Sequence, residues 1–410
     1  MHRLPEDGIG PTGEGAPGAA QSGQPAGLGL GRRGFVFGTC SAIGAGAWKP
    51  AAAQGETPGV PASAIPAGPA ERMRFWQQRP MGFVTGLYGR NTFDGAYHQA
   101  LAATGARLNR AFLRFDWDGG SGRYVLTPQA LGALGDGIRQ ARSLGVAIVL
   151  TAEFEMKPNP PLWGSPERAA AFAEAWRRVA RLLRDVPEVV GFDLLNEPNP
   201  PYSPADPNGQ REEWARLVLR TIEAVRREDA EMPIVVEGIA GGMPIGLRGF
   251  PVLNDPKLVY SIHFYNPHAI THQHVSPGWA KTLPYPVHDN ELLRGTDIFP
   301  GPWDTARLRT VLQDAVDFQQ RSRAPIYVGE FSCVRWAPGD SALRYVNDCL
   351  SFFREFGWSW TYHEFRGWPG WDAEIASRDP NERRRSADAP MMSLLRREMA
   401  RQPPGAVRGS

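Results

Sequence analysis

Apolar and polar positions alternate along most of the chain in a way that separates short strands from longer helices. Eight short runs, rich in Val, Ile, Leu and Phe, have the near-continuous apolar character of strands that are buried on both faces. These predicted strands cover residues 81–88, 107–115, 146–151, 189–195, 234–237, 258–264, 325–331 and 358–365. Because such runs are typical of parallel sheets, we expect helices to connect them.

The stretches between these runs are amphipathic and carry helix start signals. Thr127 and Ser165 each stand directly before a proline, which combines an N-cap residue with proline in the first turn. The helix after Thr127 is expected to bury Leu131, Leu134 and Ile138 on one face. Further helices are predicted over residues 95–104, 212–226, 304–318 and 341–356.

Strand and helix repeats at this spacing predict an α/β fold, namely a (β/α)₈ TIM barrel that forms a single catalytic domain over residues 71–400. A doubly wound open sheet is the alternative. The βα segment at 81–95 lacks GxGxxG and the chain has no P-loop, so a nucleotide site is not indicated. Long Pro- and Gly-rich stretches at 239–257 and 266–303 are predicted loops, and in a barrel the second would lie at the C-terminal face, where active sites occur.

The first 53 residues have the pattern of a secretory signal. Arg32 and Arg33 precede an apolar stretch, and three alanines follow at 51–53. The arginine pair resembles a twin-arginine signal, so we expect export to the periplasm or the extracellular space by that route. An ordinary disordered N-terminus is the alternative. Residues 54–70 are predicted to be a linker and 401–410 a flexible tail, and no membrane span is expected in the mature chain.

Composition and charge exclude some partners. The formal net charge is +2, with 42% hydrophobic and 21% charged residues, so neither nucleic acid nor an anionic membrane is an expected partner. No Cys/His cluster has ligand spacing, and no metal site is predicted. Cys333 and Cys349 remain after the signal and form either a disulfide in an oxidising space or two buried thiols. The sequence does not indicate an oligomeric state.

Two carboxylates follow apolar strands at the point where each strand ends. Glu197 comes after the run 189–195, and Glu330 lies at the end of the run 325–331. A barrel gathers the C-terminal ends of its strands into one ring, so we expect these two side chains to meet. Two facing carboxylates are what glycoside hydrolysis needs, although strand-end glutamates that form structural ion pairs are the alternative.

Residues 190–198 read Val-Gly-Phe-Asp-Leu-Leu-Asn-Glu-Pro, and this segment resembles the Asn-Glu-Pro signature of glycoside hydrolase family 5, the cellulase and mannanase family. The resemblance extends from about residue 81 to 370. It implies a (β/α)₈ barrel of the clan A retaining glycosidases, without a cofactor, in which Glu197 is the acid/base and Glu330 the nucleophile. Since the acid must start protonated, we expect Glu197 to be buried.

The same resemblance implies a set of residues that surround the two glutamates. Arg110 ends a segment similar to the one whose arginine supports the nucleophile, and residues 262–265 resemble the His-x-Tyr of strand six. This assigns His263 and Tyr265 to the site, with Tyr265 as a donor to the nucleophile. Asn196 is expected to bond the sugar 2-OH.

Two positions depart from the family pattern. Strand three commonly ends with Asp-x-His, where this chain has Thr151 and Glu153, so Glu153 places a third acid near the sugar. On strand eight a Trp often forms the floor of the central subsite, and here His363 stands at that point. Other tryptophans are candidates for a replacement platform, although core packing is expected for the first two: Trp358, Trp360, Trp368 and Trp371.

These observations predict a retaining glycoside hydrolase that cleaves a β-linked glucan or mannan through a covalent glycosyl-enzyme. The expected partner is an oligo- or polysaccharide. One alternative is a carbohydrate-binding protein on a barrel that has lost catalysis. Another is a related barrel glycosidase that acts on a different β-glycan.

Overall fold

The structure, a computed structural model, describes residues 65–88, 95–154, 162–206, 208–276, 279–294 and 301–401. The predicted signal at 1–53, most of the predicted linker and the end of the predicted tail lie outside these residues. The described part of the chain contains no helix that is both long and apolar enough to cross a membrane.

Eight parallel strands close into a barrel, which confirms the predicted fold. β1 pairs with β2 on one side and with β9 on the other, so the sheet has no open edge and the doubly wound alternative is excluded. A ninth strand, β3 (Arg123–Val125), pairs antiparallel with the extended end of β2. The barrel strands are β1 (Met81–Tyr88), β2 (Leu108–Asp118), β4 (Ala147–Phe154), β5 (Val189–Asp193), β6 (Ile234–Glu237), β7 (Leu258–Phe264), β8 (Ile326–Phe331) and β9 (Ser359–Tyr362).

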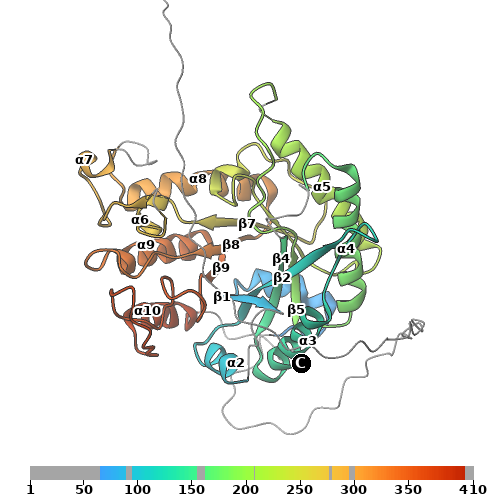
Figure 1. Cartoon of the computed structure of the whole chain (residues 1–410), viewed down its shortest axis with the longest axis horizontal. Coiled ribbons are helices and arrows are strands. Elements are labelled where there is room, and N and C mark those ends of the chain that lie inside the picture. Colours follow the sequence, from blue (N-terminus) through green and yellow to red (C-terminus); the bar gives the residue numbers. More distant parts are fainter. Residues whose placement is uncertain are drawn as a thin grey trace, which may run out of the picture. The chain divides into compact units, whose positions relative to one another are not determined.

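Helices connect these strands, and the longer ones lie around the outside of the barrel (Figure 1). They are α1 (Arg72–Gln77), α2 (Gly95–Ala102), α3 (Pro128–Leu144), α4 (Pro166–Leu183), α5 (Gly209–Arg226), α6 (His268–Thr271), α7 (Asn290–Leu293), α8 (Thr305–Ser322), α9 (Ser341–Phe356) and α10 (Pro390–Met399), with two 3₁₀ helices at Pro69–Glu71 and Pro244–Leu247. The side chains of Thr127 and Ser165 accept hydrogen bonds from the first turns of α3 and α4, as their N-cap positions predict.

The buried face of α3 differs from the prediction at one position. Leu134 and Ile138 are buried, whereas Leu131 is 40% exposed. The buried stripe of this helix begins at Ala130, and the next residue is rotated about 100° away from it.

The interior of the barrel changes character along its axis. Near the strand starts it is apolar and is closed by α1, whose Trp76 Nε1 donates a 2.8 Å hydrogen bond to the Val190 carbonyl. Two positions further along each strand the side chain again faces inward, because alternate residues of a strand face the same side. At this level the inward side chains are polar. Arg110 thus follows Leu108 on β2, and Glu237 follows Val235 on β6 with the same orientation.

The two cysteines of the described region do not form a disulfide. Cys333, in the segment after β8, and Cys349, on α9, are both free and both buried. Trp358 and Trp360 are also buried, each 1% exposed, so they pack in the core and cannot serve as sugar platforms.

Candidate active site

Arg110 lies at the centre of the polar end of the barrel and is fully buried. Its guanidinium donates to Glu330 Oε1 at 2.6 Å, to Glu237 Oε1 at 2.8 Å and to Asp193 Oδ2 at 2.9 Å. Further bonds reach Thr151 Oγ1 at 3.1 Å and the side-chain oxygen of Asn196 at 3.0 Å. Burial alone would lower the pKa of Arg110, but the three carboxyl groups raise it well above its usual value. One fixed positive charge therefore connects strands β2, β4, β5, β6 and β8.

Glu330 is an ionised carboxylate in a buried setting. Its residue is 4% exposed, and Tyr265 Oη donates to Oε2 at 2.8 Å while Arg110 holds the other oxygen. Burial opposes ionisation, but the charges of His363, His263 and Arg110 and the Tyr265 hydrogen bond lower the pKa of Glu330 to about 2. A carboxylate that is ionised and held at both oxygens is prepared to act as a nucleophile.

The orientation of the Glu330 side chain depends on a β-bulge in β8. Ile262 of β7 pairs with Val328 and the next residue, His263, pairs with Glu330, so Gly329 has no partner on β7. A Cβ atom at position 329 would lie 3.0 Å from His263 Nε2 and 3.0 Å from the Ser261 hydroxyl. The absent side chain is what lets β8 bring Glu330 alongside His263.

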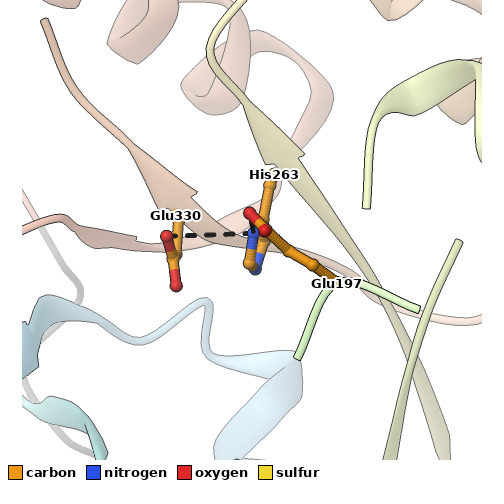
Figure 2. Close-up of side chains that lie close together, drawn as sticks. All are labelled: Glu197, His263 and Glu330. Carbon is orange, nitrogen blue, oxygen red and sulfur yellow. Dashed lines mark hydrogen bonds and ion pairs between the residues drawn. The ribbon is translucent and has the colours of Figure 1, made fainter. Parts of the chain in front are cut away.

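Glu197 lies in the loop after β5 and faces Glu330 across His263 (Figure 2). Its Oε1 is 3.0 Å from His263 Nδ1. One ligand atom each from Glu197, His263 and Glu330 lie within 4.8 Å of one another. The expectation that Glu197 is buried is wrong, because its side chain is 44% exposed. It lies beyond the last residue of β5, in a left-handed conformation with φ 51°, and its carboxylate is accessible to an incoming ligand.

Glu237, the last residue of β6, is a member of the site that the sequence interpretation missed. Its Oε1 lies 3.2 Å from His263 Nε2, and its Oε2 accepts a 3.0 Å hydrogen bond from the Glu197 backbone N–H. Burial alone would raise the pKa of Glu237, but the charges of His263 and Arg110 lower it. The criterion that singled out Glu330, a carboxylate at a strand end, would also have found Glu237.

His263 is held between carboxylates on both of its ring nitrogens. Burial would lower its pKa, but Glu237, Glu330 and Glu197 raise it well above the usual value, so the ring is a cation at neutral pH. Asp193 on β5, in contrast, favours its neutral form, since burial and Glu237 outweigh Arg110 and raise its pKa to about 8. The sequence interpretation missed Asp193 as well, because the predicted strand ran on to residue 195, whereas β5 ends at Asp193.

The His263 cation also bears on metal binding. Within the described residues, one group of His and carboxylate side chains has suitable spacing for an ion, namely Glu197, His263 and Glu330. A protonated imidazole has no free lone pair to offer a metal. The group is therefore better suited to proton transfer and charge stabilisation.

The structure brings His363 to the nucleophile but leaves Glu153 at the margin. His363 Nδ1 is 2.7 Å from Tyr265 Oη and 3.3 Å from Glu330 Oε2. Glu153 is half-buried on β4 and is not a partner of Arg110; burial and the Glu330 charge raise its pKa against the effect of Arg114.

An aromatic wall continues from His363 into the segment after β9. The Trp371 ring lies 5.0 Å from the His363 ring and 6.1 Å from the Tyr265 ring, between centroids. Trp368 packs edge-on against Trp371 at 4.6 Å and is 37% exposed. Of the four candidate platform tryptophans, these two are therefore near the site.

Comparisons with known proteins agree with this geometry. The sequence profile described as cellulase (glycosyl hydrolase family 5) matches residues 80–367. Endoglucanase C of Acetivibrio thermocellus is 26% identical over 262 residues, which cover 60% of this chain and 71% of that protein. Endoglucanase 3 of Fibrobacter succinogenes is 29% identical over 164 residues, 40% of this chain and 22% of that protein. The crystal structure of endoglucanase Cel5A from Thermotoga maritima has the same fold, with a TM-score of 0.63 at 20% identity over 80% of this chain and 99% of that one.

Proposed function

Because the chain belongs to glycosyl hydrolase family 5 and is therefore an O-glycosyl hydrolase, we propose that it cleaves a β-linked glucan or mannan with retention of anomeric configuration. The endoglucanase relatives support a glucan. The Thermotoga maritima Cel5A has also been solved with mannotriose, which keeps mannan within the proposal.

The observation that carries the proposal is the short separation of the two carboxylates. Oxygens of Glu197 and Glu330 lie within 4.8 Å of each other. A separation of about 5 Å suits direct attack and retention, whereas about 6.5–9.5 Å leaves room for a water molecule and gives inversion. The distance supports a double displacement.

In the first step Glu330 attacks the anomeric carbon while Glu197 gives its proton to the leaving glycosidic oxygen. The C–O bond to the leaving sugar breaks and an ester to Glu330 forms. In the second step Glu197 takes a proton from water, whose oxygen attacks the same carbon and releases Glu330 as a carboxylate. Arg110 and Tyr265 stabilise that carboxylate before the attack and after the release.

Asn196 has a defined orientation in this scheme. Its side-chain oxygen accepts a hydrogen bond from Arg110, which leaves the amide NH₂ as a donor. We infer that this donor binds the sugar 2-hydroxyl, an interaction that strengthens in the transition state.

The test uses E197Q and E330Q together with a matched control, E188Q. Glu188 is also a buried carboxylate paired with an arginine, but it precedes β5 at the opposite end of the barrel. We expect E330Q to lose hydrolysis and E197Q to lose about 10²–10⁴-fold, while E188Q remains active. Proton NMR of the first product should show the β-anomer. Full activity in E197Q or E330Q, or an α-product, would contradict the proposal.

The two alternatives give different results in the same experiment. A protein that only binds carbohydrate would show sugar affinity without turnover on any polysaccharide. A glycosidase for another β-glycan would hydrolyse xylan or β-1,3-glucan better than β-1,4-glucan or mannan, with the same loss in E197Q.

We also propose that the chain is exported by the twin-arginine route, with residues 1–53 as the signal and 71–400 as the catalytic domain. The support is the sequence pattern at Arg32 and Arg33. Replacing both arginines by lysine should retain the enzyme inside the cell, which cell fractionation would measure.

A further inference from the structure

His363 occupies a position where it can act on the nucleophile through Tyr265. It follows directly after β9, and its side chain is 17% exposed. Its Nδ1 is 2.7 Å from Tyr265 Oη, which in turn donates to Glu330 Oε2 at 2.8 Å. The three groups form a continuous hydrogen-bond chain that runs from β9 across to β7 and then to β8.

The number of available protons determines which group donates and which accepts in each of these hydrogen bonds. Glu330 is a carboxylate and has only acceptors, so the single hydroxyl proton of Tyr265 is used toward Glu330. Burial and the Glu330 charge raise the pKa of Tyr265 well above its usual value, so that proton stays on the phenol. Tyr265 Oη must then accept from His363, which requires the proton of a neutral imidazole to be on Nδ1.

We propose that His363 is a positioning residue that aims the Tyr265 hydroxyl at Glu330 by donating a hydrogen bond from Nδ1. The inference rests on the proposed function, because it takes Glu330 as the nucleophile. Without this donor, the Tyr265 hydroxyl is free to rotate and Glu330 loses a fixed partner at Oε2.

The surroundings of the imidazole keep it in this orientation. The Trp371 ring packs against it at 5.0 Å with an interplanar angle of 37°. On its own segment, Glu364 Oε2 lies 3.7 Å from His363 Nε2. That separation is longer than a hydrogen bond, so Glu364 does not hold the imidazole in the tautomer with its proton on Nε2.

The other titratable groups that face His363 do not replace it as a donor. His272, in the segment after β7, has its pKa lowered to about 3 by burial and by the nearby His268 and His363, so it is uncharged at neutral pH. His263 approaches the same Glu330 oxygen only to 3.9 Å. Neither imidazole therefore takes the place of His363, whose Nδ1 is 2.7 Å from Tyr265 Oη.

The experiment compares three substitutions that separate donor, charge and shape. H363N places an amide NH₂ where Nδ1 stands, in a side chain that is always neutral. H363Q places it near Nε2, on the Glu364 side. H363F keeps the ring and has neither donor. We expect H363F and H363Q to lose about tenfold in kcat with little change in KM, and H363N to recover most of that loss.

A double-mutant cycle with Y265F tests whether His363 acts through the tyrosine. H363F should cost about tenfold in the native background and almost nothing in Y265F, because the hydroxyl that it positions is already absent. Because His363 is among the groups that lower the pKa of Glu330, H363N should raise that pKa and move the acidic limb of kcat/KM to higher pH.

The experiment distinguishes failure of the His363 proposal from failure of the proposed function. If E330Q keeps full activity, the nucleophile assignment fails and His363 loses its target. If E330Q is inactive but H363F and Y265F effects are additive, or H363N is no better than H363Q, the positioning role is overturned. Thermal unfolding of each variant identifies any that has lost its fold, and H363N against H363Q then remains the deciding comparison.

Discussion

Arg110 Nη1 and Glu330 Oε1 are joined by a 2.6 Å hydrogen bond, and both side chains are buried. The same guanidinium also holds Glu237 and Asp193, so its removal leaves several carboxyl groups without their charge partner. Breaking a buried pair from one side costs about 3–5 kcal/mol. We expect R110M to lower the free energy of unfolding by at least this amount and to reduce kcat more than about 100-fold.

R72M is the matched control for that substitution. Arg72 is equally buried and bonds Asp229 at 2.8 Å, but it lies in α1 at the closed end of the barrel. Denaturant unfolding should show a similar loss of stability in R72M, while kcat at a temperature where the variant is folded stays near that of the native chain. Equal losses of kcat in the two variants would show that stability alone accounts for the R110M effect.

Substitution of Glu237 should lower the pKa of His263. The Glu237 carboxylate contributes most to the raised pKa of that imidazole, so E237Q should move its titration toward the usual value of about 6.5. The stabilisation from a raised histidine pKa is complete below the unfolded pKa and is lost as the pH rises through the folded pKa. The stability difference between native chain and E237Q should therefore shrink at alkaline pH. NMR titration of His263 measures the shift, and E153Q should leave it unchanged.

The two buried thiols are expected to be unreactive in the folded protein. Burial raises the pKa of both Cys333 and Cys349, so almost no thiolate is present at neutral pH. In a C40S chain, which lacks the third cysteine of the sequence, Cys40 in the predicted signal, a thiol reagent should label neither Cys333 nor Cys349 until denaturant is added, and then label both. Reductant should leave Tm unchanged; a fall in Tm on reduction would indicate a disulfide.

Trp368 is expected to provide a platform for a sugar unit next to the catalytic pair. Its ring is partly exposed, and the backbone of Gly370 lies against it so closely that a Cβ there would come within 1.9 Å. We expect W368A to raise KM for oligosaccharides by about three- to tenfold with kcat nearly unchanged, and W368F to retain most of the affinity. Equal KM values for W368A and the native enzyme would exclude the platform role.

The barrel could be predicted because each of its eight strands is a short apolar run, and an interior strand must be apolar on both faces. The strand β3 was missed, since three residues with one buried side chain give no periodic signal. The strand β2 continues to Asp118, beyond its predicted end, because β3 pairs with that extension.

The sequence predicted most residues of the candidate site, but it did not predict how deeply each of them is buried. Arg110, Tyr265 and Glu330 meet as the order of motifs indicates. The exposure of Glu197 could not be predicted, because a position after a strand places the Cα atom but does not determine the solvent exposure of the side chain. The ionisation of Asp193 depends on groups from distant strands, which no local pattern contains.

The unpaired Gly329 sets a limit on how this enzyme can diversify. Exposed positions in the segment after β9, such as Trp368 at 37% exposure, can accept replacements that alter which sugar is bound. At position 329 the neighbouring imidazole and hydroxyl already fill the space that any larger residue would need. A saturation library selected for activity should therefore return only glycine at position 329, whichever polysaccharide is supplied. At position 368 the selected residue should depend on the polysaccharide.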